Sequence, residues 1–188
     1  MIKSIVPALL VVGGACSALA EDQVAKPLLG FEFGASFNLY NDSRFEGNGT
    51  HFSLIYQVDA RLKAAVYHEQ GHIHGEENGN DANIDVTINQ FRVGLDLWTS
   101  SNGSQDVGLM FGFGSASYTE DIDTNELVAD VVVRYSPIRA KNGPVVGALN
   151  INASYRYAPL DNVNIGGFTA AIDDLGGFII GLGAGLYF

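Results

Sequence analysis

The sequence predicts an all-β protein, an eight-stranded antiparallel transmembrane β-barrel, and three observations carry this prediction. The last eleven residues, 178–188, alternate apolar side chains with a face made mostly of glycine and end on phenylalanine, as the closing strand of such a barrel does. Glycine and aromatic residues are abundant, with 23 Gly, 11 Phe and 8 Tyr. Beyond the N-terminal region, no segment has the run of about 18 apolar residues that a membrane helix needs, so strands must cross the membrane.

The first twenty residues, 1–20, read as a secretory signal peptide, which leaves 21–188 as the barrel. Lys3 supplies the positive start, 5–12 the apolar run, and 18–20 a small-x-small cleavage site. Cys16 is the only cysteine and would leave with this peptide, so no disulfide or thiol chemistry is expected in the mature chain. The remaining nine basic residues face 21 acidic ones, which argues against a nucleic-acid partner.

Alternation of apolar residues places eight strands, each long enough to cross a bilayer when tilted. They are expected at 30–40, 51–58, 61–70, 84–98, 107–118, 126–136, 145–157 and 178–188. The polar segments between them are expected to be loops and turns, chiefly 41–50, 71–83, 99–106, 119–125, 137–144 and 158–174. The mature length fits eight strands better than ten, which is the alternative count.

Charged residues inside the predicted strands share the parity that faces the lumen when the apolar residues face lipid. They are Glu32, Asp59, Arg61, Lys63, Arg92, Asp96, Asp130, Arg134 and Arg156. An eight-stranded barrel has an interior just wide enough for side chains to fill it. We therefore expect these residues to pair with one another as an ion-pair plug, the alternative being a gated ion path.

All four histidines lie near the second and third predicted strands: His51, His68, His72 and His74. A tight turn near residue 60 would set residue 51 opposite residue 69, so His51 is expected beside His68 and Glu69. Imidazoles suit zinc, copper or nickel, and a metal site at the outer rim is one hypothesis. Solvated histidines in a polar loop are the other.

A second chemical hypothesis concerns His51, Ser53 and Glu69, which share the inward parity and allow a Ser/His/Glu catalytic arrangement. The His-x-Ser element is similar to that of the outer-membrane lipid A deacylase PagL, although Leu54 stands where that enzyme would have asparagine. The glycine-rich stretches are followed by no helix and no lysine, so they are not phosphate loops. No cofactor is predicted.

The signal peptide, the eight alternating segments, Tyr155-Arg156-Tyr157 and the terminal Leu186-Tyr187-Phe188 together resemble the small outer-membrane β-barrels of the OmpA-like and OmpX-like superfamily. This resemblance implies a place in the bacterial outer membrane and a role in envelope integrity, adhesion or host contact. It also implies insertion by the barrel assembly machinery. The assembly signal in the terminal strand would be Phe178, Ile180, Leu182, Leu186 and Phe188.

The predicted function is therefore that of a monomer with a plugged lumen and acidic external loops. Its expected partners are outer-membrane lipids, including lipopolysaccharide, and an extracellular partner that contacts the loops. A small channel or porin-like protein is the first alternative, and a lipid A-modifying hydrolase is the second.

Overall fold

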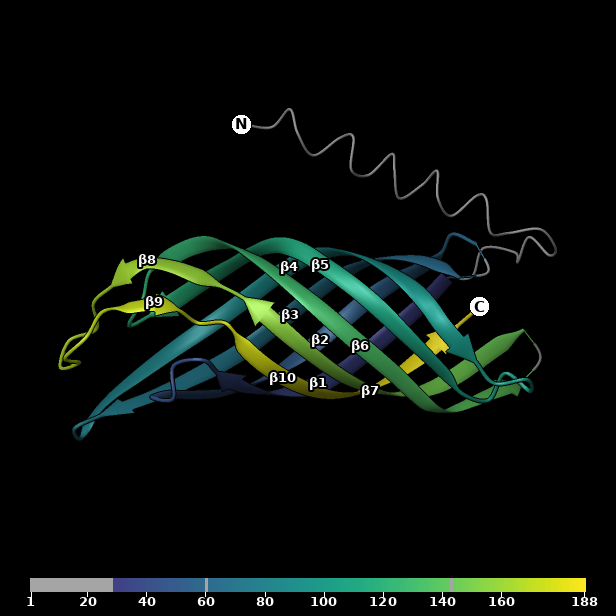
Figure 1. Ribbon diagram of the computed structural model, residues 1–188, viewed down its shortest axis with the longest axis horizontal. Helices are drawn as coiled ribbons and strands as arrows, with labels where there is room; N and C mark the ends of the chain where they lie inside the picture. Colours follow the sequence, from purple (N-terminus) through teal and green to yellow (C-terminus); the bar gives the residue numbers. More distant parts are fainter. Residues whose placement is uncertain (1–28, 60, 143) are drawn as a thin grey trace, which may run out of the picture.

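The computed structural model describes residues 29–59, 61–142 and 144–188 (Figure 1). The predicted signal peptide, 1–20, lies outside the described residues. In the described part of the chain, no helix is long and apolar enough to cross a membrane.

Eight strands close into one antiparallel barrel, in the spatial order β1-β10-β7-β6-β5-β4-β3-β2 (Figure 1). They are β1 (Leu29–Tyr40), β2 (Phe45–Gln57), β3 (Leu62–Glu77), β4 (Asn80–Thr99), β5 (Asp106–Glu120), β6 (Thr124–Asn142), β7 (Val145–Tyr157) and β10 (Gly177–Tyr187). The first and last of these strands pair along their whole length and close the barrel. The predicted all-β, eight-stranded antiparallel barrel is confirmed.

The connection between β7 and β10, residues 158–176, holds two further short strands, β8 (Pro159–Val163) and β9 (Ile172–Asp174). They form a two-stranded sheet at the end of the barrel opposite Leu29 and Phe188 (Figure 1). We call this end the distal end, the opposite one the proximal end, and the connection 158–176 the strap.

Several strands run further than predicted, and for β2, β3 and β4 the extra length lies at the distal end. β3 and β4 continue through the expected loop 71–83 and meet at a tight turn, where Asn78 and Gly79 have φ of 54° and 79°. Positive φ at both positions matches the right-handed twist of a hairpin. β2 likewise begins at Phe45, so the expected loop 41–50 is largely strand.

The expected turn 137–144 is also mostly strand, because β6 runs through Pro137 to Asn142. The register shifts between Tyr135 and Ile138, and such an irregularity accommodates a proline that has no N–H to donate to the sheet.

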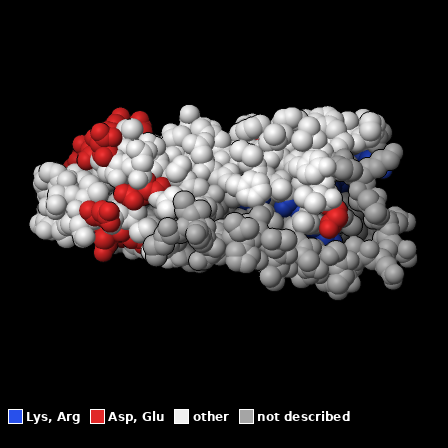
Figure 2. Space-filling model, turned by 90° about the horizontal axis from the view of Figure 1, so that it is seen from above, with Lys and Arg blue, Asp and Glu red and all other residues white. Residues whose placement is uncertain are grey.

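The outward face of the barrel carries an apolar belt over its proximal and middle part. Its members include Phe33, Phe111 and Leu182, which are 68%, 54% and 64% exposed. These residues have the parity assigned to lipid from the sequence, and the belt gives the membrane level. Figure 2 shows acidic side chains gathered at one end of the molecule, the distal end.

The interior of the distal part is a hydrophobic core, which we call the apolar layer. It contains Phe45, Ile73, Ala82, Ile84, Val86, Ile88, Ala116, Tyr118, Ile122, Val128, Ala158, Leu160, Ile165, Ile172 and Leu175. The strap contributes the last five of these residues. Further toward the proximal end, the inward positions become polar: on β4, Ile88 is followed by Gln90 and Arg92.

Candidate functional site: a filled lumen and its distal end

Arg134 of β6 anchors the proximal part of the polar lumen. Its Nη1 donates to Glu32 of β1 at 2.8 Å and to the Tyr187 hydroxyl at 3.3 Å. Glu32 also accepts from Asn150 Nδ2 at 2.8 Å and from the Tyr187 hydroxyl. The carboxylate is thus held by side chains from three strands around the barrel, with Asn150 itself fixed by Ser136 at 2.7 Å.

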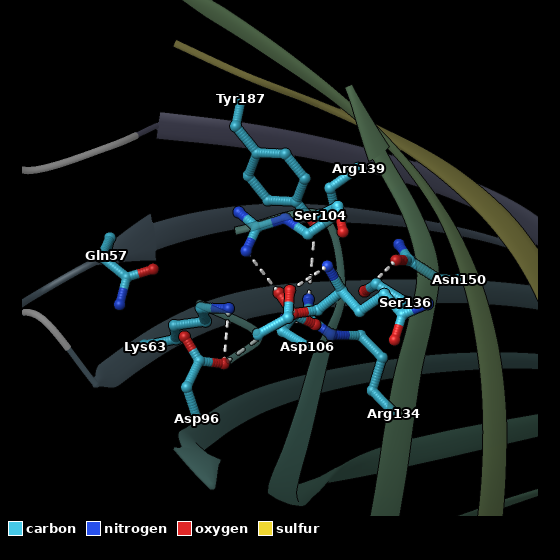
Figure 3. Close-up of polar contacts among 12 residues, drawn as sticks. Gln57, Lys63, Asp96, Ser104, Asp106, Arg134, Ser136, Arg139, Asn150 and Tyr187 are labelled. Atoms are coloured by element: carbon cyan, nitrogen blue, oxygen red, sulfur yellow. Dashed lines mark hydrogen bonds and ion pairs between the residues drawn. The ribbon is translucent and has the colours of Figure 1, made fainter. Parts of the chain in front are cut away.

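A set of ion pairs continues from Arg134 toward the proximal end (Figure 3). Lys63 Nζ lies 2.7 Å from Asp96, whose carboxylate is also 3.6 Å from Arg134 Nη2. Asp106 lies 3.8 Å from the same guanidinium and 2.7 Å from Arg139 Nη1. The buried Asp106 was not predicted, because it stands at the edge of a segment expected to be a turn.

A second set of pairs fills the middle of the lumen. Arg156 Nη2 donates to Glu69 at 2.6 Å and lies 3.7 Å from Asp130. Asp130 accepts from Arg92 at 2.7 Å, and the Arg92 guanidinium stacks 3.3 Å from the centre of the Tyr67 ring. Buried charges of this kind are tolerated only when they are paired and hydrogen-bonded.

Of the nine residues predicted to face the lumen, seven do so: Glu32, Lys63, Arg92, Asp96, Asp130, Arg134 and Arg156. The prediction was wrong for Asp59 and Arg61, which lie in the turn between β2 and β3. Asp59 Oδ1 accepts from the backbone N–H groups of Arg61 and Leu62, both at 2.7 Å, and the Arg61 side chain is exposed. Parity within a strand does not apply to a residue whose side chain closes a turn.

The space left among these side chains is small. A cavity of about 30 Å³ is lined by Ser36, His51, Ser53, Tyr67 and neighbouring arginines. Such a volume admits water molecules but not a hydrated ion or a solute.

At the distal end, the strap is fastened across the barrel to β2, β3 and β4. The Phe168 ring stacks on Phe45 at 5.8 Å, and the Arg44 guanidinium lies 5.5 Å from the centre of Phe168. Thr169 donates to the Glu77 carboxylate through its backbone N–H and through Oγ1, the latter at 2.7 Å. The strap therefore covers the apolar layer.

Charge is concentrated around these contacts. Hydrogen bonds from Thr169, followed by the charge of Arg44, lower the pKa of Glu77. Hydrogen bonds from Arg44, 2.6 Å away, likewise lower the pKa of Asp42. Of the basic residues that the structure describes, only Arg44 lies at the distal end. The acidic residues there are Asp42, Glu46, Glu76, Glu77, Asp81, Asp85, Glu120, Asp121, Asp123, Glu126, Asp161, Asp173 and Asp174.

The four histidines do not form one cluster. His51 faces the lumen and stacks on Tyr67 at 5.6 Å, whereas His68, His72 and His74 lie on the outer surface of β3. The register confirms the predicted pairing of His51 with Glu69. The expected contact of His51 with His68 was wrong, because His68 pairs with Phe52 and lies on the other side of the sheet. A cross-strand partner shares a side of the sheet, so the residue beside it lies on the opposite side.

The catalytic candidates His51, Ser53 and Glu69 do share the lumen side, where each is buried. Glu69 is engaged by Arg156, by the Tyr67 hydroxyl at 2.7 Å and by Ser36 Oγ at 3.4 Å. It is therefore not placed to orient His51 as a catalytic base. None of the three side chains reaches the lipid face, where a lipid substrate would lie.

These features define a small eight-stranded membrane β-barrel: a closed sheet with an apolar belt outside and buried ion pairs inside. The closed sheet and the belt confirm the predicted eight-stranded barrel architecture of the OmpA-like and OmpX-like kind.

Comparison with known proteins supports this class through structure alone. No family model matches the chain, and no curated protein matches its sequence. Neisserial surface protein A (NspA) is 13% identical with a TM-score of 0.54, covering 88% of this chain and 98% of that one. OprG of Pseudomonas aeruginosa is 7% identical with a TM-score of 0.55, covering 88% and 97%. Ail of Yersinia pestis, in a phospholipid bilayer nanodisc, is 16% identical with a TM-score of 0.51, covering 87% and 100%.

Proposed function

We propose that this chain is a closed, monomeric outer-membrane barrel that acts through its distal end, exposed at the cell surface, in envelope integrity or surface contact. The observation that carries the proposal is the filling of the lumen along its length. Ion pairs occupy the proximal and middle parts, and the apolar layer under the strap occupies the distal part.

The filling disfavours a channel for two physical reasons. The paired charges are already neutralised by one another, so an ion in transit would have to break pairs that are buried. The apolar layer beyond them offers no group that replaces the hydration shell of an ion.

The distal end supports a role in surface contact. Thirteen acidic residues and Arg44 give it a strongly negative character, and its strands continue beyond the apolar belt as hydrogen-bonded sheet. A field of one sign steers partners of opposite charge and repels others. Within the membrane, the partners would be outer-membrane lipids including lipopolysaccharide. The barrel assembly machinery would read Phe178, Ile180, Leu182, Leu186 and Phe188, which all face outward on or just beyond β10.

Conductance in planar lipid bilayers tests the closed lumen. We expect no discrete openings from the purified barrel, and none from Lys141→Ala, an exposed control at the proximal end. A double variant, Glu32→Ala with Arg134→Ala, removes two large interior side chains. It should let ions leak through the barrel if these side chains block their passage. Discrete, ion-selective openings from the unaltered protein would overturn the proposal.

Attachment of protein-bearing vesicles to cultured cells tests the surface role. Neutralising three exposed distal acids, with Asp121→Asn, Asp123→Asn and Asp173→Asn together, is expected to change attachment severalfold. The matched control is Asp59→Asn at the opposite end. Equal attachment by the triple variant and the control would count against a role for the acidic end.

A further inference from the structure

Three histidines lie in a row on the outer surface of β3, and each is held by a partner on β4. The Nδ1 atoms of His68, His72 and His74 lie 2.8, 2.9 and 3.4 Å from side-chain oxygens of Asn89, Asp85 and Asn83. An oxygen acceptor at Nδ1 places the ring proton there and leaves Nε2 as a free lone pair. This is the second-shell arrangement that orients metal-binding histidines.

Spacing singles out His72 and His74 within the row. Side chains two residues apart on a strand lie on one face about 6.6–6.8 Å from each other along the strand, which lets two imidazoles converge on one ion. His68 is four residues from His72, with Gln70 between them, so it lies about twice as far away. It provides a matched histidine outside the pair.

A carboxylate that can serve as a third ligand lies next to this pair of imidazoles. Glu46 of β2 is the cross-strand partner of His74, and its side chain is exposed on the same outer surface. Directly opposed residues have Cβ atoms about 4.5–5.5 Å apart, within reach of a glutamate that changes its rotamer. The surrounding acidic residues add a field that favours cations.

The pair is also accessible. His72 lies six residues beyond Val66, an exposed member of the apolar belt, which corresponds to about 20 Å along the strand. The imidazoles are thus outside the lipid and open to aqueous ions, and the His72 side chain is 47% exposed.

We propose that His72 and His74 form a surface chelate for a divalent transition metal ion of the kind that prefers imidazole, with Cu²⁺ bound most tightly. Cu²⁺ heads the affinity order of the first-row divalent ions for such ligands, and zinc and nickel follow. In the described residues, no group of three or more histidine, cysteine or acidic side chains is already placed around a metal position. The ion would therefore bind the two imidazoles first, with Glu46 turning toward it and water completing the coordination.

Titration of the folded barrel with Cu²⁺ tests the site, using protein in detergent micelles without an affinity tag. We expect one bound ion per chain by calorimetry and an electron paramagnetic resonance spectrum with coupling to two nitrogens. His72→Gln and His74→Gln should each weaken binding about tenfold or more and reduce the coupling to one nitrogen, and the double variant should abolish binding. His68→Gln should behave as the unaltered protein.

Second-shell support gives an independent measurement. Asp85→Ala removes the acceptor that orients His72 and is expected to weaken binding about tenfold while the two-nitrogen spectrum persists. All these side chains are on the outer surface, so the apparent size of the folded barrel on an unheated gel should not change. Absence of binding by the unaltered protein, binding that survives in the double variant, or binding lost in His68→Gln would each overturn the proposal.

Discussion

Glu69 is the residue whose replacement tests the filled lumen most directly. It is fully buried and accepts from Arg156 at 2.6 and 3.5 Å, from the Tyr67 hydroxyl at 2.7 Å and from Ser36 Oγ at 3.4 Å. Glu69→Gln keeps the size of the side chain but removes its charge. Among the described residues, Asp130, at 3.7 Å, is then the acidic partner left to the Arg156 guanidinium.

The expected loss follows from what is left behind. Removing one partner of a buried pair exposes the other to the full cost of an uncompensated buried charge, about 3–5 kcal/mol. Asp130 offsets part of this, so we expect the free energy of unfolding to fall by about 3 kcal/mol. Arg156→Met alone should lower the free energy of unfolding by a similar amount. The double variant should lower it by about 2 kcal/mol less than the sum of the two single effects, because neither charge of the pair is then left without its partner.

Urea unfolding in lipid vesicles or micelles measures these differences. Trp98, the single tryptophan, is half exposed at the edge of the belt and reports the transition by fluorescence. Glu76→Gln is the matched control, since it makes the same change on the same strand at an exposed site, and we expect it to stay within about 0.5 kcal/mol of the unaltered protein. If Glu69→Gln is as stable as this control, or if the effects of the two lumen substitutions simply add, the buried ion pairs do not stabilise the barrel.

Two further predictions concern the strap and the packing of the lumen. The pKa of Glu77 is lowered in the folded state. Its contribution to the stability of the folded strap is therefore complete above the ordinary pKa of a glutamate and is lost as the pH falls through the lowered value. The amide protection factor of Thr169 should accordingly fall on acidification, and a protection factor that does not change with pH would contradict this. Gly112→Ala should cost about 1–3 kcal/mol in the urea assay, because the new Cβ would press on the carboxylate of Asp130. Gly166→Ala, with nothing within 4 Å, is its control and should leave stability nearly unchanged.

The membrane half of the barrel could be predicted well from the sequence. There, the lipid requires apolar side chains outside, so one parity is apolar on every strand and the other is free to carry charge. The terminal strand and the outward face of each strand therefore lie where the alternation predicts them, and Arg92, Arg134 and Arg156 lie in the interior as expected. The contact of Arg156 with Glu69 could not be predicted, since parity gives the side of the sheet but not the contact.

The distal extensions of β2, β3 and β4 were not predicted, because apolar residues were expected to face outward beyond the membrane as well. Once a strand leaves the lipid, water lies outside and the apolar residues move to the inward parity. On β4, the inward residues Ala82, Ile84, Val86 and Ile88 alternate with polar residues, and beyond Asn89 the apolar residues are the outward ones, beginning with Phe91. Apolar and polar residues alternate along the whole strand, but the apolar ones face inward in the distal part and outward in the membrane part. A stretch whose apolar residues face inward resembles a polar loop when apolar residues are expected to face lipid.

This inversion changes how the distal end is understood. Predicted as loops, it would have been a set of flexible chains whose acidic residues had no fixed arrangement. The apolar layer, the strap stacked on Phe45 and the β3–β4 hairpin instead give it a packed core of the kind found in water-soluble barrels. Side chains on such a surface lose little conformational entropy when they bind, since the strands beneath them are already ordered. The two proposals for this end, a surface that meets partners and a pair of imidazoles that meets a metal ion, both depend on that rigidity. Each weakens if amide exchange shows the distal strands opening independently of the membrane half.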